Sequence, residues 1–281
     1  MHAIARRRRP RAPIACSAIS IMPWPWEQPK ALEPEPFVAE AWQKYAVIVG
    51  YAVSSFLLYS IFKGLFARNR AGAGAAVAKE DRDGSGRLVS LFHCTIVSIT
   101  SLYAVTTSSP LDFTDANGLE PTIGSLGLCV STAYFIYDLH VLIETNFHPL
   151  KPMVAHHLLS GSCMMLIALS VPRAAWYACL LQATEVTAPV NISIFFLERR
   201  KGHKGMVLYS ALRWLQLALW IVMRELLFVY FAYMVWRDWG SMPPVMKALG
   251  WGTGVPLFAF NTAALFKVAL KGIPWTPKKE A

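Results

Sequence analysis

Long apolar stretches separated by short polar loops make up most of the chain after its first 36 residues. A transmembrane helix needs about 20 consecutive, mainly apolar residues. Seven stretches of this kind cover residues 42–66, 88–107, 123–143, 153–171, 174–197, 206–236 and 246–270. No alternation with a period of two persists long enough to indicate a β-barrel. The pattern predicts an all-α fold, a polytopic membrane helix bundle of about seven transmembrane helices.

The composition agrees with a membrane protein. Of the 281 residues, 55% are hydrophobic and 16% are charged, whereas a soluble domain averages about 25% charged residues. The formal net charge of +10 is carried by too few side chains to coat a nucleic-acid-binding face, so we expect no nucleic-acid partner. The five cysteines form no Cys-x-x-Cys pair, and neither a disulfide framework nor a metal site is predicted.

The distribution of lysine and arginine predicts the orientation. Seven spans place 15 of these residues on one side and 5 on the other, when the five arginines of the N-terminal tail are set aside. Because cytosolic loops carry the excess of positive charge, we expect a cytosolic C-terminus. The chain ends Lys278-Lys279-Glu280-Ala281, which resembles the dilysine retrieval signal of endoplasmic reticulum membrane proteins. That membrane is the expected location, with an organelle envelope as the alternative.

Residues 1–36 form a basic, proline-rich segment. Five arginines and no acid lie in its first 26 residues. An arginine-rich, acid-poor N-terminus is typical of an organelle-targeting segment, and also of a disordered basic tail. Both interpretations stay open.

Ionisable side chains at membrane depth are costly, so each one is a candidate for function. At about 1.5 Å per residue, several lie at a similar depth in the cytosolic half of the membrane. These are His93, Asp138, His156, His157 and Arg213, joined by the polar Asn191. Neighbouring residues on a helix point about 100° apart, so His156 and His157 cannot both bind one metal in simple geometry. One of them can face a cavity while the other bonds an adjacent helix. We expect Asp138 to orient one imidazole as a base or nucleophile. The alternative is a structural histidine bonded between helices.

Two further charged residues are predicted to meet deeper in the membrane. Arg224 shares a helix face with Arg213 and is expected to point inward, towards Glu185. Pro189 lies four residues after Glu185 and cannot donate a hydrogen bond to its carbonyl, so the helix should loosen there. The pair is either part of a polar cavity or a structural ion pair.

Together these residues resemble the TLC-domain family, which includes the ceramide synthases. The matching motifs are Arg87-x-x-Ser90-x-x-His93, Tyr134-x-x-Tyr137-Asp138, His156-His157, Glu185-x-x-x-Pro189-x-Asn191 and Arg224 in an aromatic-rich late helix. The resemblance implies a six-helix domain over residues 87–275, preceded by a first transmembrane helix and cytosolic loop over residues 37–86 and followed by a cytosolic tail, 276–281. It also implies a link to lipid metabolism.

One departure concerns activity. Ceramide synthases carry a His-Asp-x-x-Asp motif in the span after the histidine pair, whereas this chain reads Leu-Gln-Ala-Thr-Glu over residues 181–185. The chain is therefore closer to the general TLC-domain group than to the ceramide synthases.

Two function hypotheses follow. The first is an acyltransferase in which His156 or His157 acts on an acyl-CoA co-substrate, Asp138 orients the imidazole, and Arg213 or basic loop residues meet the phosphates. His93, Glu185, Asn191, Arg213 and Arg224 would line its cavity. The second is a lipid-binding or lipid-homeostasis protein without chemistry. A transporter ranks well behind, because residues 126–130 offer few polar groups to continue a path. No cofactor is expected, the partners are membrane lipids, and the oligomeric state is not predicted.

Overall fold

The computed structural model describes residues 36–68, 75–108, 110, 122–145, 150–171 and 174–270. In these segments the chain is helical and contains no strand, so the prediction of an all-α bundle is confirmed. The predicted N-terminal segment, apart from Pro36, and the C-terminal tail lie outside the described residues.

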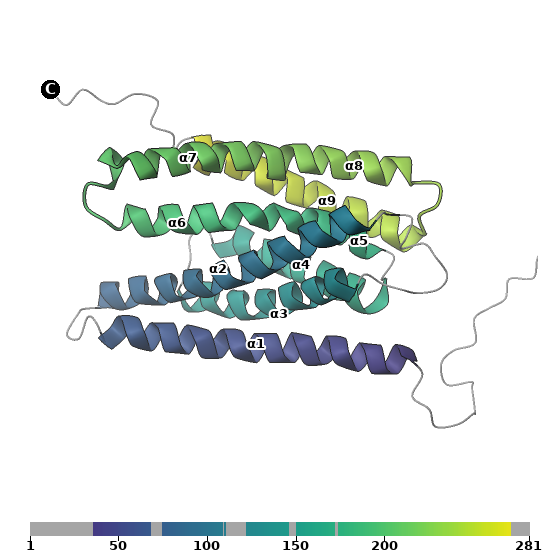
Figure 1. Ribbon diagram of the computed structural model, residues 1–281, viewed down its shortest axis with the longest axis horizontal. Helices are drawn as coiled ribbons and strands as arrows, with labels where there is room; N and C mark the ends of the chain where they lie inside the picture. The colour runs from purple at the N-terminus through teal and green to yellow at the C-terminus, as the bar shows by residue number, and fades with distance from the viewer. Residues whose placement is uncertain are drawn as a thin grey trace, which may run out of the picture.

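In the described residues the helices form seven continuous helical segments, called rods below, which run back and forth along the bundle (Figure 1). Four are single helices: α1 (Pro36–Arg68), α2 (Ala75–Thr107), α3 (Thr122–Glu144) and α4 (Leu150–Ser170). The fifth joins α5 (Ala175–Gln182), the 3₁₀ segment η3 (Ala183–Thr187) and α6 (Ala188–Glu198). After the short turn η4 (His203–Gly205), the sixth joins α7 (Val207–Trp220), the π-helix η5 (Ile221–Leu226) and α8 (Leu227–Arg237). The seventh joins α9 (Pro244–Ala264) and the π-helix η6 (Leu265–Leu270).

Within the described segments, six rods are long and apolar enough to cross a membrane. The seventh, α9–η6, is not among them, although it covers the apolar stretch predicted over residues 246–270. The helices also extend beyond the predicted spans. α2 begins at Ala75, 13 residues before the predicted start at 88. A helix can continue into water where polar side chains face outward, and hydropathy alone does not detect that part.

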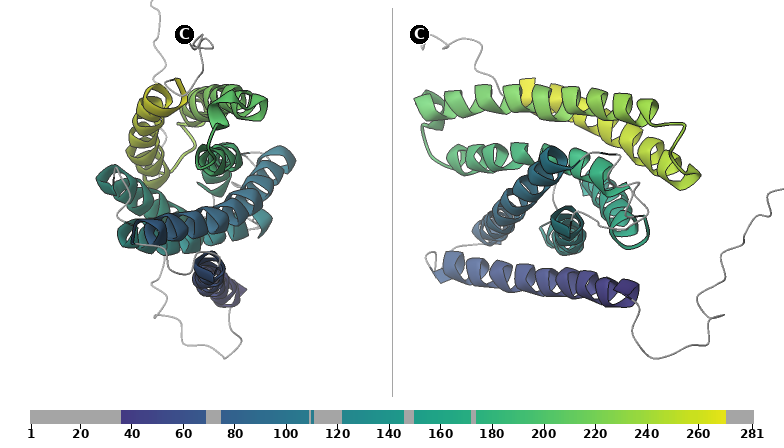
Figure 2. Two further views of the ribbon diagram at one scale, coloured as in Figure 1. Left: turned by 90° about the vertical axis from the view of Figure 1, so that its left-hand side faces the viewer. Right: turned by 45° about the vertical axis from the view of Figure 1, so that its right-hand side comes forward.

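The core is centred on α5, which is buried along nearly its whole length. The end-on view in Figure 2 shows the α5–α6 rod inside the bundle, with α1 on the outside. Gln182, at the end of α5, joins three helices: its Nε2 donates to Ser131 and, at 3.2 Å, to the Gly127 carbonyl, and its Oε1 accepts from Ser101 at 3.0 Å. A buried amide satisfied on both sides fixes α2, α3 and α5 against one another.

Ion pairs and hydrogen bonds show which helix ends lie together. Lys63 near the end of α1 pairs with Glu144 at the end of α3 at 2.7 Å, and Arg199 after α6 pairs with Asp83 of α2 at 3.3 Å. At the opposite end, Tyr177 of α5 donates to Asp238 after α8 at 2.5 Å. The rods therefore alternate in direction. Below, the end that holds the Lys63–Glu144 and Arg199–Asp83 pairs is called the basic end.

Candidate functional site

The two adjacent histidines of α4 have different environments. His157 is buried, with its Nε2 2.7 Å from Asp138 Oδ2 on α3 and its Nδ1 2.8 Å from the Met153 carbonyl oxygen. Because both ring nitrogens face acceptors, the His157–Asp138 pair must hold two hydrogens between them. His157 thus links α3 to α4, and neither of its nitrogens is free to act on another molecule.

His156 points elsewhere. Its ring stacks on Phe260 of α9 with centroids 4.9 Å apart, and Phe135 of α3 meets its edge. Its Nδ1 is buried and has no hydrogen-bond partner among the described residues. A buried polar atom of this kind requires an explanation, because burying an unpaired imidazole nitrogen costs free energy.

His156 lines an internal cavity of about 910 Å³, a volume that includes space open to the surroundings. The charged and amide side chains of the lining, together with His156, are Gln182, Glu185, Arg224 and Asn261, and hydroxyl groups come from Ser131, Ser160, Tyr177, Thr184 and Thr253. Beyond them the walls are mainly apolar, with residues such as Met164, Ile167, Val235 and Met246. The cavity therefore has a polar region and an apolar region.

On α4, the lining runs from His156 to Ile167. Eleven residues of α-helix rise about 16 Å. The hydrocarbon core of a bilayer is about 30 Å thick, so the cavity extends over about half of it. This is the reach of an acyl chain in one leaflet.

Glu185 and Arg224 face each other, as predicted. Arg224 Nη2 lies 3.9 Å from Glu185 Oε1, while its Nε donates to Thr187 at 2.9 Å and its Nη1 to Asn261 at 2.8 Å. Cys94 of α2 donates to Glu185 Oε2 at 3.3 Å. Glu185 and Thr187 belong to the 3₁₀ segment just before Pro189, so the helix departs from α-helical geometry there, but as a tighter turn and not as the predicted loosening. The guanidinium is held by neutral oxygens more closely than by the carboxylate.

The other candidates lie outside the cavity lining. His93 of α2 is buried and stacks on Tyr134 of α3, with centroids 3.7 Å apart and planes 4° from parallel. Asn191 accepts from Gln216 at 2.7 Å, and Gln216 in turn accepts from Arg213 at 2.9 Å. Arg213 also bonds to Tyr209 and Glu198. This network binds α6 to α7, and it occupies the guanidinium that the sequence had proposed for phosphate contacts.

A model of the TLC domain, the TRAM, LAG1 and CLN8 homology region, matches residues 84–270. The chain belongs to the TLC-domain family. The match covers α3 to η6 and most of α2, so the resemblance inferred from the motifs is confirmed. No curated protein and no solved structure matches the chain.

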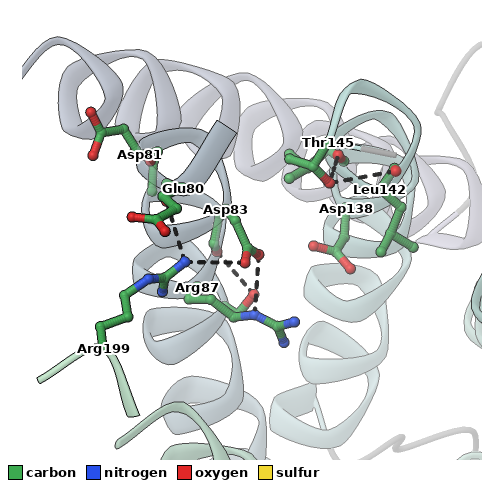
Figure 3. Close-up of polar contacts among 12 residues, drawn as sticks. Glu80, Asp81, Asp83, Arg87, Asp138, Leu142, Thr145 and Arg199 are labelled. Atoms are coloured by element: carbon green, nitrogen blue, oxygen red, sulfur yellow. Dashed lines mark hydrogen bonds and ion pairs between the residues drawn. The ribbon is translucent and has the colours of Figure 1, made fainter. Parts of the chain in front are cut away.

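The basic end of the TLC domain carries a further charge cluster (Figure 3). Asp83 Oδ1 lies 3.6 Å from Arg87 Nε and its Oδ2 lies 3.3 Å from Arg199 Nη2. Both guanidinium groups also lie over the ring of Phe195, at 5.1 and 3.7 Å. The motif residue Arg87 thus takes part in the contact between α2 and the end of α6.

Three residues of the TLC domain that contribute to the site were missed by the sequence reasoning. Gln182 and Asn261 line the cavity, and Thr187 binds Arg224. All three are neutral, whereas the prediction rested mainly on ionisable side chains. The signal was present, because a glutamine and an asparagine inside predicted spans are also unusual.

Proposed function

We propose that the protein is an acyltransferase of the endoplasmic reticulum membrane, similar to the ceramide synthases, which transfers the acyl group of an acyl-CoA thioester to a lipid acceptor. One observation carries the proposal: His156 lines a largely apolar cavity and has an unpartnered ring nitrogen. A neutral imidazole with a free nitrogen is a nucleophile suited to acyl transfer.

The reaction has two steps. His156 attacks the thioester carbonyl carbon, and the carbon–sulfur bond breaks with its electron pair going to sulfur. The imidazole proton leaves with the sulfur as CoA thiol, and the acyl group remains on His156. An amine or hydroxyl of the acceptor then attacks the acyl carbon, and the bond between that carbon and the His156 nitrogen breaks with its electron pair going to the imidazole. The acceptor's proton passes by way of Glu185 to this nitrogen, which restores His156.

Other lining residues fit roles in this scheme. Arg224 lines the same cavity as His156 and would stabilise the oxyanion that forms on the carbonyl oxygen. Glu185 lines the same cavity and would accept the acceptor's proton. The His157–Asp138 pair holds the start of α4 against α3 and would fix the position of the adjacent His156.

The second candidate function is lipid binding without chemistry. This function is favoured because the Asp138 carboxylate bonds to His157 and not to His156, the histidine that lines the cavity. The polar region of the cavity would then hold a headgroup, and His156 Nδ1 would bond to it.

Purified protein in lipid nanodiscs, supplied with acyl-CoA and a sphingoid base, tests the first candidate. We expect acyl transfer and an acyl adduct on His156 by mass spectrometry, both lost in His156→Asn. His140→Asn is the matched control, since His140 is a solvent-exposed histidine paired with Glu144. Full activity in His156→Asn would overturn the catalytic assignment. A lipid that copurifies with wild-type protein showing no turnover would establish the second candidate instead.

A further inference from the structure

A second hollow lies beside the cavity, between α8 and α9. It is a groove of about 520 Å³ lined only by apolar residues and glycines. Four residues line both hollows: Phe228, Phe231 and Val235 of α8 and Gly250 of α9. One layer of side chains therefore separates the groove from the cavity.

The outer rim of the groove faces the bilayer. Val229 and Val255 are each more than half exposed, and Trp251 is nearly so. Phe231 lies six residues before Arg237, the last residue of α8, which places it about 9 Å from that end of the helix. The rod Val207–Arg237 is long and apolar enough to cross a membrane, and the medium around the apolar outer face of such a rod is hydrocarbon. The occupant that fits an apolar groove there is the hydrocarbon chain of a bilayer lipid.

Phe231 and Val235 of α8 meet Gly250 and Gly254 of α9 in the wall that separates the groove from the cavity. A Cβ placed on Gly254 would lie 3.0 Å from Phe231 Cε1, and one on Gly250 would lie 3.7 Å from both Val235 methyl groups. The absence of side chains at these two positions brings α9 close to Phe231. The ring of Phe231 fills the space between the two hollows.

The polar contacts between the two rods lie further along α9. Arg224 donates to Asn261, Thr262 donates to Glu225, and Trp220 Nε1 donates to the Asn261 carbonyl at 3.3 Å. Pro256 stands inside α9, between these contacts and the glycines of the wall. A proline inside a helix removes one backbone hydrogen bond and weakens the helix there. The half of α9 that forms the wall can thus bend while the other half stays bonded to η5.

We propose that the seam between α8 and α9 is a lateral portal through which the hydrocarbon chain of a bilayer lipid passes between membrane and cavity, with Phe231 as its gate. The portal rests on the proposed function, since it supplies the cavity with the chain that this function requires. It adds a route: the acceptor lipid reaches His156 from within the bilayer, without leaving it.

A reversible lock tests the portal in the full chain. In the double variant Val235→Cys and Gly250→Cys, a sulfur in place of a Val235 methyl would lie about 3.7 Å from the new Cβ, close enough for a disulfide after a small shift. The probe is a fatty acid with a photoactivatable group and an alkyne, added to proteoliposomes of phosphatidylcholine. Labelling of peptides that line the cavity, around residues 156–167 and 177–185, is read by mass spectrometry.

We expect cavity labelling to be lost when the double variant is oxidised and restored by a reductant, with both single variants unaffected by either treatment. Equal labelling in the locked and reduced forms would overturn the portal while leaving the cavity as a chain-binding site. An unlabelled cavity in the wild-type protein would overturn the proposed function and the portal with it.

A second variant tests the gate without a disulfide. Phe231→Ala should speed cavity labelling about tenfold, which corresponds to about 1.4 kcal/mol off the entry barrier. Leu226→Ala is the control, because Leu226 is an exposed residue of the same rod that lines neither hollow. An unchanged rate in Phe231→Ala would refute the role of Phe231.

Discussion

The strength of the His157–Asp138 contact decides whether the start of α4 is rigid enough to position His156. The perturbation is a double-mutant cycle with Asp138→Ala, His157→Ala and the double variant. The pair is 2.7 Å apart, with 6% and 13% of its side-chain surfaces exposed. Ordinary hydrogen bonds between membrane helices contribute only about 0.6 kcal/mol on average. A hydrogen bond to a charged group contributes about 1.5–3 kcal/mol, and removing one partner of a buried pair costs about 3–5 kcal/mol.

We therefore expect each single variant to lose about 3 kcal/mol and the coupling free energy to be about 2 kcal/mol. The assay is equilibrium unfolding with sodium dodecyl sulfate in mixed micelles, followed by circular dichroism. A second cycle, Ser90→Ala with Tyr134→Phe, is the matched control: it removes a neutral hydroxyl pair, also 2.7 Å apart, between α2 and α3. Coupling no greater than in this control would show that the pair is an ordinary interhelical contact, and the positioning role would be wrong.

Two further predictions concern packing and pH. Gly127→Ala should lower the free energy of unfolding in detergent by about 1–3 kcal/mol, because the new Cβ would lie 2.6 Å from Thr100 Oγ1. The control is Gly50→Ala, whose Cβ would have nothing within 4 Å and should cause no such loss. Equal melting temperatures in the two variants would contradict the close approach of α2 and α3. The hydrogen bond from Arg237 lowers the pKa of Asp238, which lies after the end of α8. Its carboxylate therefore stabilises the fold above the ordinary aspartate pKa of about 3.9, and this contribution is lost as the pH falls further, through the lower folded pKa. The difference in melting temperature between wild type and Asp238→Asn should shrink below about pH 4, and a constant difference from pH 3 to pH 7 would refute the linkage.

The sequence predicts the rods better than their ends. Each of the seven predicted apolar stretches coincides with one of the rods described, because the bilayer requires about 20 apolar residues for each crossing. Hydropathy misses the first 13 residues of α2, where Asp83 meets Arg87 and Arg199. Those residues are polar, and their helix depends on contacts with another rod that a single stretch of sequence does not reveal.

For the site, the sequence predicts the divergence of the two histidines but not the direction of each. Side chains 100° apart must face different neighbours, yet only the packed structure shows that Asp138 meets His157 and that His156 faces the cavity. Helical spacing correctly places Arg224 opposite Glu185. It does not predict the contact of Glu225 with Thr262, since regular α-helix geometry turns neighbours apart.

The backbone of η5 explains why helical spacing does not predict the contact between Glu225 and Thr262. Arg224 and Glu225 both lie in the π-helix η5, and both reach α9, at Asn261 and Thr262. Glu185 lies in a 3₁₀ segment of the neighbouring rod. Short π and 3₁₀ segments are often found at functional sites because they turn side chains in directions that an α-helix does not allow. Since two adjacent rods depart from α-helical geometry where their charged residues meet, the irregular backbone and the polar lining of the cavity are best explained together, as the means by which a mainly apolar bundle holds polar groups around His156.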